Sequence, residues 1–317
     1  MKKLLGLFVV LVLLYAALWA TVPAARGSQN HVNMARRIGQ YGVISLGAGA
    51  LIITGGIDLS VGSFIGLCTT VLAVGLSEKQ WSAPGAIGVV LALGAAAGLV
   101  HGLLVTKLKL QPFVVTLCGL FIYRGLARWY AADGNAGLGN GFLDFRRAFS
   151  RSEFINLPIE FVYLILAAAV FGALLHRSIY GRYLFAIGSN ELAARYSGIR
   201  VDRYKILAYV LCSLSAACFS IMHLAEIASV QPSSTGSLIE LYAIAGAVLG
   251  GCSLRGGDGN VVGIVVGTSI LAMLKTAVFF WGVPDALEYT AIGAALLLGA
   301  VLDEFFRRRA PTVRRRG

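Results

Sequence analysis

Charged side chains are scarce in this chain. Only 13% of its 317 residues are Asp, Glu, Lys or Arg, against roughly 25% in soluble domains. Hydrophobic residues make up 57% of the sequence. This balance argues against a soluble protein and predicts a polytopic membrane protein, with room for about ten helices of ~20 residues each.

Several catalytic signatures are also missing. The sequence has no Gly-Lys dipeptide, and therefore no P-loop with which to hydrolyse ATP. Its four histidines are widely scattered, and we find no paired carboxylates and no Ser/His/Asp set, which argues against a lipid-modifying membrane enzyme. The five cysteines form no CxxC pair, lie in or beside apolar segments, and are predicted to pack as small apolar residues: Cys68, Cys118, Cys212, Cys218 and Cys252.

The net charge of +12 could indicate a nucleic-acid partner, but no separate soluble domain is available to carry a basic patch. The Lys and Arg residues instead lie in short segments between apolar runs and at both ends of the chain. This is the distribution of the positive-inside rule, so we predict no nucleic-acid partner. The six arginines of residues 307–317 are interpreted as an orientation signal beside anionic membrane lipid.

The apolar segments predict an all-α fold, a transmembrane helical bundle of about ten spans in a single domain, residues 1–317. The first segment resembles a signal peptide but exceeds the usual apolar length of about 7–15 residues, so a retained helix is expected. The eighth is short, which favours a broken or re-entrant element. The predicted spans are residues 4–22, 38–54, 62–77, 84–105, 113–130, 158–176, 206–229, 238–251, 260–280 and 287–305.

Counting Lys and Arg residues gives the orientation. With the N-terminus inside, inside segments hold 17 of the 27 basic residues and outside segments hold 7, so both termini are predicted to be cytoplasmic. Two groups disagree with this orientation: Arg36 with Arg37, and Arg146 with Arg147 and Arg151. The second group lies in the longest outside segment, residues 131–157, whose Gly/Asn run is either a contact for a soluble partner or a spacer.

One acidic residue, Asp58, stands inside a highly apolar stretch. It could lie on a water-accessible path or in a helix break shielded from lipid. The eight-residue segment around Asp58, residues 55–62, is similar to residues 250–257. The two segments match at four positions, which suggests a duplicated architecture. We predict a gating or helix-break motif from both segments, made of Gly55, Gly56, Asp58, Ser60, Gly62, Gly250, Gly251, Gly256, Gly257 and Asp258.

The inside segment 177–205 is the most informative polar segment. Asn190 can cap a short helix whose first turn carries Glu191, and Gly198 can end it. Arginines surround this helix, so it either docks a cytosolic partner or lies on lipid headgroups; the pattern alone leaves both open.

Three ordered blocks resemble one protein family. Gly-Gly-Ile-Asp-Leu-Ser-Val-Gly at 55–62 looks like the signature of permease subunits of bacterial ABC importers of the ribose, arabinose and xylose type. The segment 191–198 resembles the coupling motif of such permeases, although Ser189 and Leu192 replace the usual Gly and Ala. The third block runs from Gln231 to Gly259, and the resemblance covers about residues 32–305.

The resemblance implies the partners and the division of labour. Two permeases, as a homodimer or a heterodimer, would enclose a monosaccharide pathway in the inner membrane of a bacterium. An extracytoplasmic sugar-binding protein would deliver the sugar, and a duplicated cytosolic ATPase would hold ATP-Mg, so no cofactor is expected in this chain and it is not itself an enzyme. The residues expected to couple to the ATPase are Glu191, Ala193, Ala194, Arg195 and Gly198.

The pathway itself is the least determined part of the sequence. Small polar and aromatic side chains inside spans are candidates, but each could equally form hydrogen bonds between helices. These candidates are Ser63, Thr69, Thr116, Tyr123 and Ser269. The alternative function is an ion-coupled secondary transporter of a small polar solute, in which Asp58, Glu226 and Glu240 would be proton or cation sites.

Overall fold

The computed structural model describes residues 2–138, 141–154 and 157–284, together with residues 287, 289–290, 293–294 and 297. In this part of the chain almost all regular structure is helical. Five helices are long and apolar enough to cross a membrane, within residues 4–21, 83–106, 159–177, 201–227 and 261–280. This confirms the all-α membrane class. The predicted count of about ten spans is not established by these five, and the tenth predicted span, 287–305, lies mostly outside the described residues.

The helices follow one another with short connections. In chain order they are α1 (Lys2–Thr21), α2 (Ser28–Ile53), α3 (Val61–Ser77), α4 (Ala83–Thr106), α5 (Pro112–Tyr130), α6 (Leu143–Arg146), α7 (Ile159–Gly172), α8 (Ile179–Ser189), α9 (Glu191–Tyr196), α10 (Val201–Ile227), α11 (Ile239–Leu249) and α12 (Val261–Phe280). Two antiparallel pairs of two-residue strands accompany them, β1 (Ala136–Gly137) with β4 (Ser229–Val230) and β2 (Glu153–Phe154) with β3 (Leu157–Pro158).

Every predicted span up to residue 280 coincides with a helix, with corrected boundaries. The second predicted span begins ten residues too late, because α2 starts at Ser28 and carries Arg36 and Arg37 within the helix. The seventh also starts too late, since α10 begins at Val201. One helix of the segment 177–205 was missed altogether: α8 has 11 residues, and Ser178 caps it by accepting a hydrogen bond from the Gly181 N–H.

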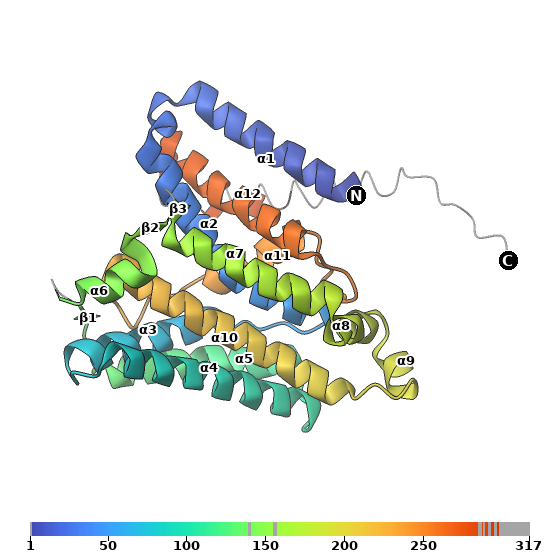
Figure 1. Cartoon of the computed structure of the whole chain (residues 1–317). Coiled ribbons are helices and arrows are strands. Elements are labelled where there is room, and N and C mark those ends of the chain that lie inside the picture. The colour runs from blue at the N-terminus through green and yellow to red at the C-terminus, as the bar shows by residue number, and fades with distance from the viewer. Residues whose placement is uncertain are drawn as a thin grey trace.

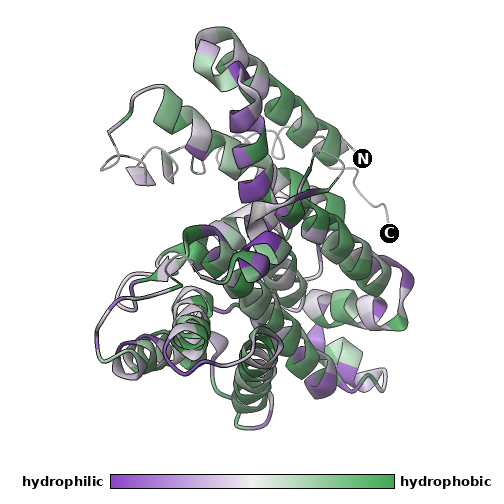
Figure 2. Cartoon of the chain, turned by 60° about the vertical axis from the view of Figure 1, so that its left-hand side comes forward, coloured by the Kyte–Doolittle hydropathy of each residue, from purple (hydrophilic) through white to green (hydrophobic). Residues whose placement is uncertain are grey.

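The bundle has two distinguishable ends (Figure 1). α8 and α9 lie together at one end, which we call the α9 end, while β1, β2, β3 and α6 gather at the other, which we call the β end. α1 ends at Thr21, whose hydroxyl accepts a hydrogen bond from the Trp281 side chain, just after α12. The N-terminus of α1 lies at the opposite end of this helix, toward the α9 end (Figure 1). Most helix bodies are green, while purple, hydrophilic residues lie in turns, at helix ends and along the first half of α2 (Figure 2).

Small residues allow the closest helix contacts. On α4, Gly94, Gly98 and Gly102 form one stripe, and a Cβ on any of them would lie 2.4–3.0 Å from atoms of α10. α11 and α12 cross in the same way, with Gly250 against the backbone of Gly263 and Gly267 against that of Gly246. Close backbone approach of this kind replaces the hydrophobic driving force that lipid cannot supply.

Two of the five basic residues that opposed the predicted orientation, Arg36 and Arg146, have partners at the β end. Arg36 lies 3.1 Å from the fully buried carboxylate of Glu160 on α7, which also accepts a hydrogen bond from Ser150 at 2.5 Å. Arg146 donates to the carbonyls of Ala225 and Glu226 in the last turn of α10, where a cation is favourable. Held by these partners, Arg36 and Arg146 carry little of the information on which the positive-inside rule depends.

Candidate functional site

Two glycine-containing turns and the helix α8 meet near the α9 end. The Gly257 N–H donates to the carbonyl of Ile53 at 2.9 Å, which joins the turn after α2 to the turn before α12. Gly188 of α8 is packed against both, because a Cβ there would overlap Ile53 O and Gly257 N. Gly55 and Gly256 adopt positive φ values, +77° and +85°, which favour glycine. The structure therefore brings the two predicted helix-break segments together and adds Gly188, which the sequence did not single out.

Asp58 closes the break between α2 and α3. Its Oδ1 accepts hydrogen bonds from the Ser60 N–H at 2.8 Å and the Ser60 hydroxyl at 2.6 Å. Its Oδ2 lies 3.4 Å from Nδ1 of His101 on α4, and the Tyr123 hydroxyl of α5 pairs with the other ring nitrogen at 3.0 Å. Asp58, Ser60 and His101 are all buried. This arrangement fixes the start of α3 to two neighbouring helices, and His101 is a partner that sequence reasoning missed.

The short helix α9 forms as the sequence predicted. The Asn190 side chain accepts from the Ala193 N–H at 3.0 Å, and the chain leaves the helix at Gly198, whose φ is +81°. Ala194 is buried against Ile187 and Val201. On the other side Leu192 is 67% exposed and Tyr196 90% exposed, so α9 presents an apolar face to its surroundings.

An ion network ties α9 to the long helices. Glu191 accepts from Lys205 of α10 at 2.6 Å and from Arg195 at 2.9 Å. Arg195 also reaches Asp202 at 2.7 Å, and Asp202 pairs with Lys107, just beyond α4, at 3.0 Å. Partial burial would raise the pKa of Glu191, but its hydrogen bonds with Lys205 and Arg195 outweigh this, and the pKa lies below its usual 4.5. The network makes α9 an extension of α4 and α10.

A pocket with a volume of about 450 Å³ lies beside the end of α9. It is lined by aromatic, basic and small side chains and backbone: Tyr183, Ser197, Gly198, Ile199, Arg200, Arg203 and Tyr204. Its two arginines give the α9 end an electropositive recess next to the exposed Tyr196.

The predicted pathway residues use their hydroxyls within the bundle. Four of them are buried and donate to backbone carbonyls three or four residues earlier in the chain: Ser63, Thr69, Thr116 and Ser269. Tyr123 is paired with His101, as described above. Their predicted role along a solute pathway stays a prediction.

A polar turn precedes α11 and packs on α3. Arg124 of α5 donates to the carbonyls of Pro232 and Thr235 at 2.9 and 2.7 Å. A Cβ on Gly62 would overlap the Gly236 carbonyl and the Glu240 carboxylate, and one on Gly66 would lie 2.6 Å from the Thr235 carbonyl. The turn is thus held between a glycine face of α3 and the guanidinium of Arg124.

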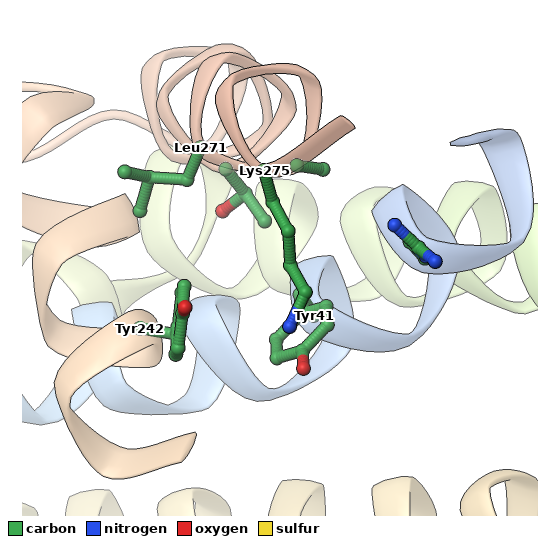
Figure 3. Close-up of a pocket in the computed structure, with 7 residues that line it drawn as sticks. Tyr41, Tyr242, Leu271 and Lys275 are labelled. Carbon is green, nitrogen blue, oxygen red and sulfur yellow. The ribbon is translucent and has the colours of Figure 1, made fainter. Parts of the chain in front are cut away.

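Figure 3 shows a second pocket, between α2, α11 and α12. The rings of Tyr41 and Tyr242 lie 5.6 Å apart, and the Lys275 ammonium lies 5.7 Å from the Tyr242 ring. The cavity measures about 10 Å³, room for about one water molecule. A monosaccharide does not fit there in this conformation. Among the described residues, no three or more His, Cys, Asp or Glu side chains cluster as a metal site.

Apolar helices of membrane length, two short helices that begin after breaks, and a capped helix projecting at one end define a multi-pass membrane protein. Residues 30–301 match the family model described as branched-chain amino acid transport system / permease component. The chain belongs to this family.

Characterised relatives carry transport names. The chain is 35% identical over 306 residues to the ribose import permease protein RbsC of Bacillus subtilis (strain 168), covering 96% of this chain and 93% of the relative. It is 34% identical over 279 residues to RbsC of Escherichia coli (strain K12), covering 86% and 85%. The autoinducer 2 import system permease protein LsrC of Klebsiella pneumoniae subsp. pneumoniae is 36% identical over 268 residues, covering 84% and 76%. No solved structure matches the chain.

Proposed function

We propose that this chain is the permease subunit of an ATP-driven importer of monosaccharides in a bacterial inner membrane. The relatives named above import ribose or autoinducer 2, and these names favour a small polyhydroxylated solute over the amino acids in the description of the family. ATP hydrolysis would take place on a separate duplicated ATPase, which would hold ATP-Mg.

The observation that carries the proposal is α9. A six-residue capped helix at the end of the bundle exposes Leu192 and Tyr196 on one face, an apolar pair that a partner protein would bury. The arginine-lined pocket beside it suits acidic side chains of that partner. Glu191, Ala193, Ala194, Arg195 and Gly198 would cap, pack and orient the helix, while Leu192 and Tyr196 make the contact. This assigns the interaction energy to two residues outside the predicted coupling set.

The remaining partners follow from the same orientation. With the α9 end cytoplasmic, the N-terminus of α1 is cytoplasmic, as the Lys and Arg distribution predicts, and the β end faces the exported sugar-binding protein. The segment 131–157 lies at that end, where β1 pairs with β4, which supports a docking role over a simple spacer. A second permease, identical or related, would complete the pathway.

The ion-coupled alternative is less well supported. Two of its three candidate carboxylates already have polar partners, Asp58 with Ser60 and Glu226 with Gln40, each at 2.8 Å. It also leaves the exposed face of α9 without a function.

The docking proposal is tested with Tyr196→Glu in the permease co-expressed with its ATPase. A carboxylate in an apolar contact costs several kcal/mol when it is desolvated, so we expect the ATPase to be lost from the purified complex. Leu143→Glu on α6, 55% exposed and at the β end, is the matched control and should retain the ATPase. Retention of the ATPase by Tyr196→Glu would contradict the assignment.

A further inference from the structure

The turn of residues 231–238, like the break after α2, lies within the bundle. α11 has 11 residues and rises about 16 Å, and its far end packs on the start of α12 at Gly263, on the α9 side of the bundle. On the other side of the turn, Gly66 of α3 touches Thr235. Eleven further residues of α3 follow Gly66, so the helix extends about 17 Å beyond the turn. The turn therefore lies near the middle of a hydrocarbon core of about 30 Å.

At that depth the turn is both non-helical and polar. Gln231, Ser233, Ser234 and Ser237 are exposed. The Ser234 hydroxyl donates to the Gln231 side chain at 2.8 Å. Non-helical backbone at membrane depth is tolerated only where protein buries it or where it lines a water-filled cavity. Exposed serines on such a segment therefore point to water rather than to lipid.

The turn is also rigidly held. The fixed fork of the Arg124 guanidinium binds the carbonyls of Pro232 and Thr235 at once. On the opposite side Gly236, with φ +82°, lies against the backbone of Gly62. Support from two helices keeps the exposed hydroxyl and amide groups in place, which is what a binding surface requires.

We infer that the turn Gln231–Ser237 is a solute-contact site at the middle of the translocation pathway, where hydroxyl and amide groups exchange hydrogen bonds with a neutral polyhydroxylated solute. The site rests on the proposed function and specifies where in this chain the sugar is met. Arg124 is its positioning residue, because its charge is directed to backbone carbonyls rather than offered to the solute.

The test is cysteine labelling with MTSET, a charged, membrane-impermeant thiol reagent, on the assembled transporter in vesicles. Ser234→Cys is compared with Phe121→Cys, which lies three residues before Arg124 on α5 and is 68% exposed. The unsubstituted protein with its five cysteines supplies the background. We expect Ser234→Cys to react about tenfold faster than Phe121→Cys, because only the former meets water, and D-ribose delivered by the binding protein during ATP turnover should slow the reaction.

Three results would overturn the inference. The first is equal labelling of the two positions, and the second is labelling of Ser234→Cys that D-ribose leaves unchanged while D-ribose is being transported. The third is oxidative cross-linking of two Ser234→Cys copies, which would make the turn a subunit contact. Failure of the proposed function looks different. In that case the unsubstituted transporter shows no ATP-dependent uptake of D-ribose, D-xylose or L-arabinose, while the comparison with Phe121→Cys still reports whether the turn meets water.

Discussion

Asp202 holds α9 in register with the long helices, and its removal should uncouple ATP hydrolysis from transport. Its carboxylate lies 2.7 Å from Arg195, 3.0 Å from Lys107 and 3.7 Å from Lys109. The Asp202 side chain is 20% exposed and its partners are 37–63% exposed, so solvent screens each pair to about 0.2–1 kcal/mol. For Asp202→Asn the three together give a loss of about 1–2 kcal/mol, which shifts the population of correctly held α9 by about 5–30-fold.

The assay measures solute accumulated per ATP hydrolysed by the reconstituted complex. Asp202→Asn should lower this ratio severalfold while the ATPase remains bound, because Leu192 and Tyr196 are unchanged. Lys109→Gln is the matched control, since this lysine is 63% exposed and the farthest of the three partners, and it should leave the ratio nearly unchanged. An unaltered ratio in Asp202→Asn, with the melting temperature also unaltered, would refute the role of the network.

Three further predictions follow from the buried site and from α9. Gly62→Ala should destabilise the detergent-solubilised protein by about 1–3 kcal/mol, because the new Cβ overlaps Glu240, whereas Gly88→Ala, with nothing within 4 Å, should not; equal melting temperatures would contradict the packing. Asp58→Ala should reduce uptake and thermal stability more than Asp58→Asn, which can still accept the Ser60 N–H; if the two variants behave alike, that hydrogen bond is unimportant. Because the folded pKa of Glu191 is lowered, its contribution holds above its ordinary 4.5 and fades as pH falls through the folded value, so proteolysis of the α8–α10 connection should stay constant from about pH 7 to about pH 5; acceleration already at mildly acidic pH would exclude this.

Local patterns in the sequence were sufficient for most helices and for the break after α2, but not for α8. Apolar length predicted nine segments that coincide with helices, and the Asn190 cap with the Gly198 stop predicted α9, because caps and stops act within a few residues. The same locality explains the boundary errors. From its sequence neighbours alone, Arg36 is interpreted as a residue that flanks the helix. In the fold, Glu160, more than a hundred residues later in the chain, lies beside Arg36, and this pairing allows α2 to include it.

The site depended on contacts that no local pattern shows. His101 is an isolated histidine in an apolar helix until the fold brings it to Asp58 and Tyr123. The polar turn was noted in the sequence only through Gln231 and Pro232, and its depth in the bundle became visible once the length of α11 and the glycine face of α3 were known. Lone polar residues acquire their role from the helices packed around them.

The central claim is that this chain forms the membrane pathway of an ATP-driven sugar importer. The most direct test is uptake of D-ribose, D-xylose and L-arabinose by vesicles containing the permease, its ATPase and its binding protein, with ATP and ion gradients supplied separately. The account predicts accumulation of at least one of these sugars that requires ATP and persists when proton and sodium gradients are dissipated. Accumulation that continues without ATP and collapses with an ion gradient would contradict it.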